Sequence, residues 1–444
     1  MQEEPDRALA EPVSLPERPL RIAFVTETYP PEVNGVAMTL AELVRRLQAR
    51  QHQISLIRPR QGHERIGEKR HQPHQPHQAD QADQADQPYQ VDQISPPDGG
   101  LPIDEFLVHG VQIPRYSQLR MGLPAKSLLM RRWAMQRPDV VHIATEGPLG
   151  WSALQAARRL KLPVTTDFRT NFHAYSGHYG LRWLYKPIMG YLRTFHNLAH
   201  RTTVPTKTLM AQLAAGGFER LAVVARGIDA ERFNPRHRCE ALRARWGLAE
   251  GDFAVLYVGR LAAEKNLDGL AVAFEAIERA NPRARLILVG DGPMRVALEA
   301  RLPKALFCGQ QMGHDLARCY ASADLFLFPS KTETFGNVTV EAMASGLPVV
   351  AFADGAALEL VRTDENGASV DLANDAGYVS EATRLALNAA ACQRMGVAAR
   401  ATALQLDWET IANRFELVIR GAIQSERGPS PNSQVNVRRP IPIR

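Results

Sequence analysis

The sequence predicts an α/β protein built from two domains, each with a parallel sheet that helices cover on both faces. Short apolar runs typical of buried strands alternate with longer segments of helical periodicity, and this alternation occurs twice, over about 20–225 and about 250–400. A length of 444 residues agrees with two or three domains. Because open parallel sheets bind ligands at the carboxyl ends of their strands, two such domains predict a ligand site in the cleft between them.

The first series opens with the apolar strand RIAFVT and the loop ETYPPEVNG. The helix that follows places Leu40, Leu43, Val44 and Leu47 on one face. Its further elements are the strands QISLIRP and DVVHIA, the helix GPLGWSALQAARRL, the strands LPVTTDF and RTTVP, the helix TKTLMAQLAAGG and the strand LAVVA.

The second series begins near Asp252 with the strand FAVLYVG and the helix LDGLAVAFEAIERA. It continues through RLILVG, PMRVALEARL, ALFCG, DLARCYASA, DLFLFPS, VTVEAMASG and LPVVAFA. We therefore expect a first domain at 20–225 and a second at 226–404. A last helix at 405–425 could pack on either domain.

The remaining segments are too polar to form a core, and we expect them to be disordered. They are the tails 1–19 and 426–444 and an insertion at 61–97, which contains the tandem repeats HQPHQPHQ and ADQADQADQ. His71, His74 and His77 in this insertion could bind a metal, but a solvated tract is the favoured interpretation.

The composition argues against a membrane-spanning protein, a secreted protein and a disulfide-rich or zinc-binding protein. Hydrophobic residues make up 45% and charged residues 23%, as in ordinary soluble proteins, and no run approaches the ~18 apolar residues of a membrane span. The polar, acidic start does not have the form of a secretory signal. The four cysteines show no C-x-x-C spacing, which favours reduced thiols and a cytoplasmic setting.

Two glutamates flank a predicted helix start after the strand DLFLFPS. Glu333 lies in the loop KTETFG, and Glu341 lies on the helix that begins near Gly336. Free N–H groups at a helix start favour a phosphate, and carboxylates accept hydrogen bonds from sugar hydroxyls. The pair therefore suits a nucleotide-sugar, although a loop charge and an exposed helix residue would explain the spacing equally simply.

Two cations follow a neighbouring strand. Arg260 and Lys265, in FAVLYVGRLAAEKN, would reach the same sheet edge and neutralise a diphosphate; two solvated loop cations are the alternative. Gly290, in LILVGDGP, marks a tight turn, and the dinucleotide fingerprint G-x-G-x-x-G is absent there.

Taken together, these motifs resemble the retaining glycosyltransferases of family four. The resemblance rests on VGRLAAEKN, LVGDGP, FCG, ADLFLFPSKTETFGNVTVEAMASGLPVV and the front loop TETYPPEVNGVAMTL, and it covers most of 20–425. It implies the GT-B fold, in which two Rossmann-like domains face each other across a cleft. The front loop and DFRTNFHAY are most similar to the branch of GDP-mannose-dependent α-mannosyltransferases and of diacylglycerol or sulfolipid glycosyltransferases.

The resemblance also implies roles for individual residues. Arg260 and Lys265 would hold the donor diphosphate, Glu333 the hydroxyls of the hexose, and Glu341 those of the ribose. The backbone contacts to sugar and phosphate would come from Gly35, Gly290, Phe335, Gly336, Asn337 and Val338, with Cys308 and Gly309 near the base. The last helix, around Trp408, would cross back to the first domain.

One position departs from the family pattern. The family often has a histidine near the transferred hexose where this chain has Arg169, in TTDFRTNFHAY. Arginine stays charged and cannot act as a base, but it can stabilise charge on a leaving phosphate. His173, four residues further on, is the other candidate.

Basic residues cluster between Asp167 and Glu219, a stretch without any acidic residue. Cations mixed with aromatic side chains there suit an anionic membrane surface, although a packed helix with a solvated basic face is equally ordinary. The residues concerned are Arg169, Arg182, Lys186, Arg193, Arg201 and Lys207, with Trp183, Tyr185 and Tyr191. No nucleic-acid-binding signature occurs in the chain.

We therefore expect a retaining glycosyltransferase that moves mannose or glucose from a GDP- or UDP-linked donor to a lipid or glycan hydroxyl. It would need no metal and no cofactor beyond the donor substrate. It would work in the cytoplasm, with a possible position at the inner face of the membrane. The alternative is an inactive GT-B protein that binds a nucleotide-sugar without transferring it, and Arg169 is the only feature that favours it.

Overall fold

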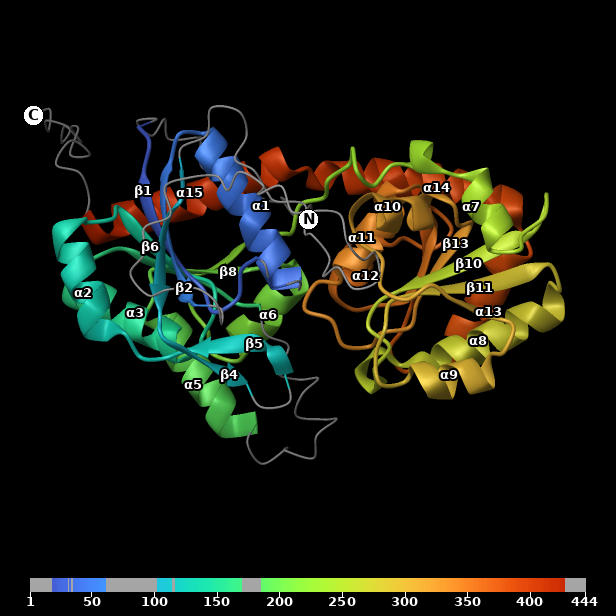
Figure 1. Cartoon of the computed structure of the whole chain (residues 1–444), viewed down its shortest axis with the longest axis horizontal. Coiled ribbons are helices and arrows are strands. Elements are labelled where there is room, and N and C mark those ends of the chain that lie inside the picture. The colour runs from blue at the N-terminus through green and yellow to red at the C-terminus, as the bar shows by residue number, and fades with distance from the viewer. Residues whose placement is uncertain are drawn as a thin grey trace, which may run out of the picture.

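The computed structural model describes residues 18–30, 32, 35–60, 102–113, 116–169 and 185–427. Outside these residues lie 1–17, 428–444, the insertion, His173, Arg182 and Trp183, so the structure describes two residues of each expected tail. Figure 1 shows two lobes side by side, with the amino-terminal half of the chain in one and most of the carboxyl-terminal half in the other.

The first lobe contains a seven-stranded sheet in the order β3-β2-β1-β6-β7-β8-β9. All its neighbouring strands are parallel, and Ile22, on an interior strand, pairs with Ile54 on one side and Val140 on the other. The strands are β1 (Arg21–Val25), β2 (Gln53–Pro59), β3 (Asp104–Val108), β6 (Val140–Ile143), β7 (Val164–Asp167), β8 (Arg201–Val204) and β9 (Leu221–Val223).

Helices cover this sheet, and a small antiparallel ribbon extends beside it. The helices are α1 (Gly35–Ala49), α2 (Lys126–Met135), α3 (Pro148–Arg159), α5 (Tyr185–Asn197) and α6 (Lys207–Ala215), and the ribbon is β4 (Gly110–Ile113) with β5 (Tyr116–Gly122). Neither β3 nor the ribbon was predicted from the sequence; both follow the polar insertion directly.

The second lobe contains a six-stranded parallel sheet in the order β12-β11-β10-β13-β14-β15. Its central strands are apolar throughout, as expected where helices cover both faces. The strands are β10 (Phe253–Val258), β11 (Ala284–Val289), β12 (Leu306–Phe307), β13 (Leu325–Phe328), β14 (Val349–Phe352) and β15 (Gly367–Val370).

Eight α-helices of 6 to 15 residues belong to the described part of this lobe. They are α7 (Glu240–Arg245), α8 (Leu267–Ala280), α9 (Arg295–Arg301), α10 (Gly313–Ala321), α11 (Asn337–Ala344), α12 (Gly355–Leu360), α13 (Asp375–Ala386) and α14 (Ala389–Ala403). Three 3-10 turns occur as well, η2 (Pro235–His237) before α7, η3 (Ala263–Lys265) between β10 and α8, and η4 (Leu404–Leu406) after α14.

The chain passes between the lobes twice, and the two crossings run side by side. Ile228 N on the way out donates to Leu406 O on the way back, at 2.9 Å. Gly227 has no room for a side chain, since a Cβ there would lie 2.4 Å from the indole ring of Trp408.

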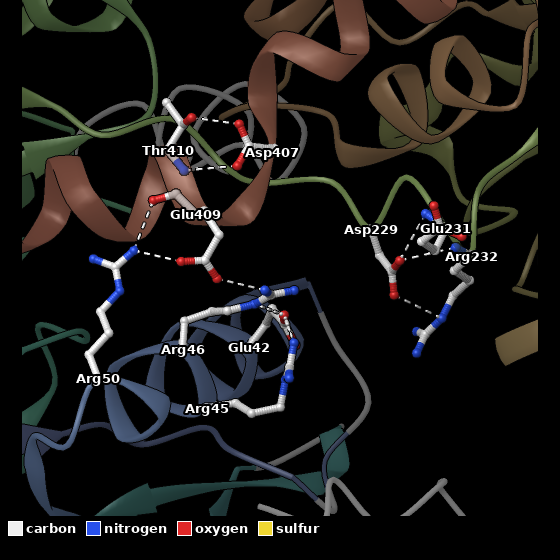
Figure 2. Close-up of polar contacts among 10 residues, drawn as sticks. All are labelled: Glu42, Arg45, Arg46, Arg50, Asp229, Glu231, Arg232, Asp407, Glu409 and Thr410. Atoms are coloured by element: carbon white, nitrogen blue, oxygen red, sulfur yellow. Dashed lines mark hydrogen bonds and ion pairs between the residues drawn. The ribbon is translucent and has the colours of Figure 1, made fainter. Parts of the chain in front are cut away.

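The last helix, α15 (Trp408–Arg427), packs on the first sheet, as Figure 1 shows in red. Ile411, Phe415 and Ile419 lie in one apolar cluster with Phe24 and Leu43 of the first lobe. Two ion pairs reinforce this packing: Glu409 binds Arg46 at 2.7 Å and Arg50 at 2.8 Å, both from α1 (Figure 2).

Candidate functional site

The loop after β13 carries the sequence-predicted Glu333 and is held in place by α12. Glu333 N donates to Asp354 Oδ2 at 2.6 Å, and Ala356 N donates to Phe335 O, also at 2.6 Å. Gly355 lets the two segments approach, because a Cβ there would lie 2.5 Å from Phe335 O. The aromatic ring of Phe335 is buried and anchors the loop before α11 begins.

Gly336 immediately precedes α11 and has φ +88°, a left-handed conformation that favours glycine. The helix then starts at Asn337, so the N–H groups at its start follow the Glu333 loop directly. Val338 packs on the core of the second domain. The sequence expectation of a helix start next to Glu333 is confirmed.

Lys265 and Glu333 meet across the carboxyl edge of the second sheet. Lys265 Nζ lies 2.5 Å from Glu333 Oε1, and the ion pair is mostly shielded from solvent. Asn266 fixes the position of the lysine, because its Nδ2 donates to Pro329 O at 3.0 Å. A cation and a carboxylate that the sequence places 68 residues apart are thus adjacent in the structure.

Arg260 follows the same strand but does not join this ion pair. Its side chain is 51% exposed, and Nη1 lies 3.5 Å from Glu264 Oε1. The guanidinium is therefore available to an anionic ligand at the cost of a weak surface contact.

Gly290 shapes the neighbouring turn. Its φ is +134°, and a Cβ there would lie 2.0 Å from Gly259 O, so the turns after β10 and β11 can touch only through glycine. Gly290 N donates to Gly309 O at 2.8 Å, which links it to the segment that contains Cys308.

Glu341 occupies a different environment from Glu333. It faces inward from α11, and Tyr320 Oη donates to its Oε2 at 2.9 Å. Burial raises the pKa of Glu341 to about 7, although Tyr320 and the positive charge of Arg232 act in the opposite direction. This carboxyl group therefore changes its charge near neutral pH.

The first domain contributes Gly35, at the start of α1. A Cβ at Gly35 would lie 3.7 Å from Asn337 Nδ2 and 3.8 Å from Arg226 Nη1. The start of α1 therefore lies opposite the start of α11. Two helix starts that face one another favour an anion between them.

Arg169 follows β7, at the carboxyl edge of the first sheet. Its side chain is 9% exposed, and its Nε donates to Asp167 Oδ2. Its Nη1 is buried and makes no hydrogen bond with the residues that the structure describes. Arg169, Asp167 and Arg226 line a cavity of about 20 Å³ beside Trp408.

Sequence reasoning missed Arg226 and Glu27. Arg226 directly follows the strand run LAVVA, and its position after a strand was the available signal. Glu27 follows β1; its Oε1 accepts from Leu149 N at 3.2 Å, and burial raises its pKa to about 7. Glu27 lies in the front loop TETYPPEVNGVAMTL, but no role was assigned to it from the sequence, and Arg226 lies outside the motifs on which the family resemblance rests.

The basic residues between Asp167 and Glu219 lie on several helices and strands of the first domain. Lys186 and Arg193 lie on the exposed side of α5, whereas Leu192 and Phe195 of the same helix are buried. Tyr191 is exposed, and its ring centroid lies 5.6 Å from that of Trp151 on α3. Arg201 is on β8 and Lys207 on α6, so the cations do not form a single helical stripe.

Comparison with known proteins places the chain among sugar transferases. Residues 33–232 match the family model described as Glycosyltransferase Family 4, and residues 239–402 match the model Glycosyl transferases group 1. A GDP-mannose-dependent alpha-mannosyltransferase of Mycobacterium tuberculosis is 32% identical over 404 residues, which cover 89% of this chain and 95% of that protein. The sulfoquinovosyl transferase of Arabidopsis thaliana is 31% identical over 68% of this chain and 60% of its own length.

Solved structures agree on the fold. The Anabaena protein HepE in complex with UDP superposes with a TM-score of 0.68 at 19% identity, covering 90% of this chain and 100% of its own. WaaG, a glycosyltransferase involved in lipopolysaccharide biosynthesis, gives a TM-score of 0.63 at 16% identity, with 90% and 100% covered.

The two lobes and the matched family models define a glycosyltransferase with the GT-B fold. The chain belongs to the family-four glycosyltransferases, as the motifs around Lys265 and Glu333 predicted.

Proposed function

We propose that this enzyme transfers mannose from GDP-mannose to a hydroxyl group of a glycolipid acceptor, with retention of the anomeric configuration. One observation carries the proposal: 32% identity to a GDP-mannose-dependent alpha-mannosyltransferase along nearly the whole of both chains. A relative named alpha-monoglucosyldiacylglycerol synthase, from Acholeplasma laidlawii, is 26% identical over 78% of this chain and supports the lipid acceptor. Glucose and a UDP donor are the alternatives that the test must separate.

The second domain would bind the donor. Lys265 and Arg260 would contact the diphosphate, and the N–H groups of Asn337 and Val338 would hold a phosphate oxygen. Glu333 would accept hydrogen bonds from hexose hydroxyls, and Glu341 from the ribose. The proximity of Lys265 to Glu333 and of Gly35 to Asn337 supports this arrangement.

Transfer would follow a front-face course. The bond between the anomeric carbon and the phosphate oxygen breaks, and its electron pair moves to the phosphate. The acceptor oxygen forms its bond on the same face of the sugar and passes its proton to the departing phosphate oxygen. Arg169 would stabilise the phosphate charge, so this course needs no histidine at its position.

The acceptor side would lie against a membrane surface. Among the described residues, the helices include none that is long and apolar enough to cross a bilayer. The exposed cations Lys186 and Arg193 lie on the same helix as Tyr191, whose ring is also exposed, and cations combined with an aromatic ring suit anionic lipid headgroups.

The test is a comparison of donors followed by product analysis. Ligand binding raises the melting temperature by mass action, so GDP-mannose should stabilise the protein more than UDP-glucose or an ADP-sugar at equal concentration. Donor consumption with a diacylglycerol-based acceptor should then give an α-linked product by NMR. If the protein binds the donor but neither transfers the sugar nor slowly hydrolyses the donor, the inactive binding protein is favoured instead.

A further inference from the structure

Arg226 lies at the junction of the two domains and is outside the motifs on which the family resemblance rests. It is in the first crossing, three residues after β9, and its side chain reaches into the second domain. Arg226 Nη1 donates to Asn337 Oδ1 at 3.3 Å. The same nitrogen would lie 3.8 Å from a Cβ at Gly35. The guanidinium therefore lies between the start of α1 and the start of α11.

Arg226 makes no direct ion pair with the described residues, although the negative charges of Asp167 and Glu333 act on it. Its hydrogen-bond partner there is the neutral amide of Asn337, although a guanidinium has five N–H donors. Burial lowers the pKa of Arg226 to about 10; the charge of Arg169 acts in the same direction, and the charges of Asp167 and Glu333 oppose it only in part. A shielded guanidinium without an ion pair is costly, and an incoming anion would remove that cost.

The guanidinium of Arg169 is a second observation that supports an anion site next to Arg226. Arg169 lines the same cavity as Arg226, and its buried Nη1 also makes no hydrogen bond with the described part of the chain. Within the described ranges, Asp167 is the one carboxylate that lines this cavity, so two positive charges there face a single negative one. At about 20 Å³ the cavity admits a water molecule but no phosphate. The anion would thus lie on the other side of Arg226, toward the two helix starts.

We propose that Arg226 is a third cationic ligand of the donor diphosphate, in addition to Arg260 and Lys265, and that it contacts the phosphate that leaves with the nucleotide. The inference rests on the proposed function and adds to it a residue supplied by the crossing segment. Because Arg226 comes from the junction, its contact with the phosphate links donor binding to the relative position of the two domains. Arg169, behind it, reinforces the positive charge at that phosphate.

A purely structural role would have a different signature. If Arg226 only joined the domains through Asn337, its loss would weaken the binding of every nucleotide to the same extent. A contact with the phosphate next to the sugar instead affects nucleoside diphosphates and leaves nucleoside monophosphates unchanged. The comparison of GDP with GMP, or of UDP with UMP, separates the two roles.

The experiment measures both affinities by calorimetry for the wild type, Arg226→Ala, Arg226→Gln and Arg226→Lys. Arg226→Gln keeps a donor for Asn337 but loses the charge, so it decides the question even if Arg226→Ala folds poorly. Arg236→Ala is the matched control, because Arg236 lies on the same connection, exposed and paired with Glu231 at 2.7 Å.

We expect Arg226→Gln to weaken diphosphate binding at least about tenfold, with monophosphate binding unchanged. Arg226→Lys should retain part of the affinity, and Arg236→Ala all of it. Equal losses for both nucleotides, or no loss for either, would overturn the role of Arg226 while leaving the proposed function intact. Failure of the wild type to bind any nucleoside diphosphate would overturn both.

Discussion

Lys265 Nζ and Glu333 Oε1 lie 2.5 Å apart, so the cation assigned to the phosphate and the acid assigned to the hexose neutralise one another. The ion pair holds both side chains at the sheet edge, where the donor would meet them. A diphosphate would compete with Glu333 for the lysine, and the freed carboxylate could then accept hydrogen bonds from the sugar. Donor binding and orientation of the hexose would in this way be coupled through one contact.

The first prediction concerns this ion pair. Lys265→Ala should lower turnover at least about 100-fold, because it removes a charge that stabilises the leaving phosphate. Glu333→Ala should also remove turnover while leaving nucleoside diphosphate binding largely intact, since the nucleotide lacks the hexose. Steady-state kinetics and calorimetry measure the two effects.

Lys304→Ala is the control for this pair of variants, since Lys304 is exposed and pairs with Glu278 at 3.0 Å. It should match the wild type in both assays. A normally folded Lys265→Ala protein with full activity would show that the phosphate ligand is assigned wrongly.

The second prediction is a pH dependence that originates at Glu341. Burial raises the pKa of this group to about 7, so the free protein holds a proton there at lower pH. Ribose hydroxyls bind best to the ionised form, and donor binding must then release that proton. Affinity for the nucleotide-sugar should fall as the pH drops below about 7, approaching tenfold per pH unit.

The measurement is calorimetric titration of the nucleotide-sugar between about pH 5.5 and pH 8 in buffers of differing ionisation enthalpy. The wild type should release a proton when it binds the nucleotide-sugar, and Glu341→Gln should release none. The affinity of Glu341→Gln should therefore not vary with pH. Should the wild type bind equally well across the range, Glu341 does not contact the ribose as a carboxylate.

The third prediction concerns the support of the Glu333 loop by α12. Gly355 has φ +54°, and a Cβ there would lie 2.5 Å from Phe335 O and 3.1 Å from Glu333 Cβ. Gly355→Ala should therefore displace the loop and raise the KM for the donor, besides lowering the melting temperature.

Gly247→Ala provides a matched control, since Gly247 has φ +73° but no atom within 4 Å of the added Cβ. Both variants carry the strain of a left-handed residue, about 1–2 kcal/mol. The KM should change only in Gly355→Ala. Equal kinetics in the two variants would mean that α12 does not set the position of Glu333.

Much of this site was accessible from the sequence because its residues follow apolar strands. Lys265 comes after β10 and Glu333 after β13, and these strands are neighbours in the sheet. Parallel topology brings their carboxyl ends to one edge, so proximity follows from strand order. The short spacing of Gly336 and Glu341 likewise placed one before the helix and the other on it.

The features of the site that could not be predicted from the sequence depend on contacts between segments far apart in the chain. Arg226 acquires its significance only where the first crossing meets α11, and nothing near Arg226 in the chain indicates Asn337 as its neighbour. Arg260 shows a second limit of the sequence. Like Lys265 it follows β10, yet its side chain turns to Glu264 and not to Glu333. Strand order predicts the edge of a sheet but not the rotamer of a long side chain.

The fourth prediction tests the basic surface of the first domain. The double variant Lys186→Glu with Arg193→Glu should lose binding to vesicles that contain anionic lipid, because each cation contributes about 1 kcal/mol near such a surface. Cosedimentation with vesicles at low and high salt measures this.

Arg279→Glu with Lys304→Glu makes the same change in charge on exposed positions of the second domain and serves as the control. It should bind vesicles like the wild type. Loss of binding in both double variants would mean that overall charge, and not the α5 surface, attracts the membrane.

The last prediction separates the two kinds of contact that hold α15 on the first domain. Phe415 is buried between Phe24 and His142, with ring centroids 6.0 Å and 4.8 Å away, so Phe415→Ala leaves a cavity and should cost about 3–5 kcal/mol of unfolding free energy. Glu409, 56% exposed, pairs with Arg46 and Arg50 on the surface, and Glu409→Ala should cost less than about 1 kcal/mol. Urea denaturation followed by tryptophan fluorescence compares the two variants. A larger loss in Glu409→Ala than in Phe415→Ala would mean that ion pairing, rather than apolar burial, holds the returning helix in place.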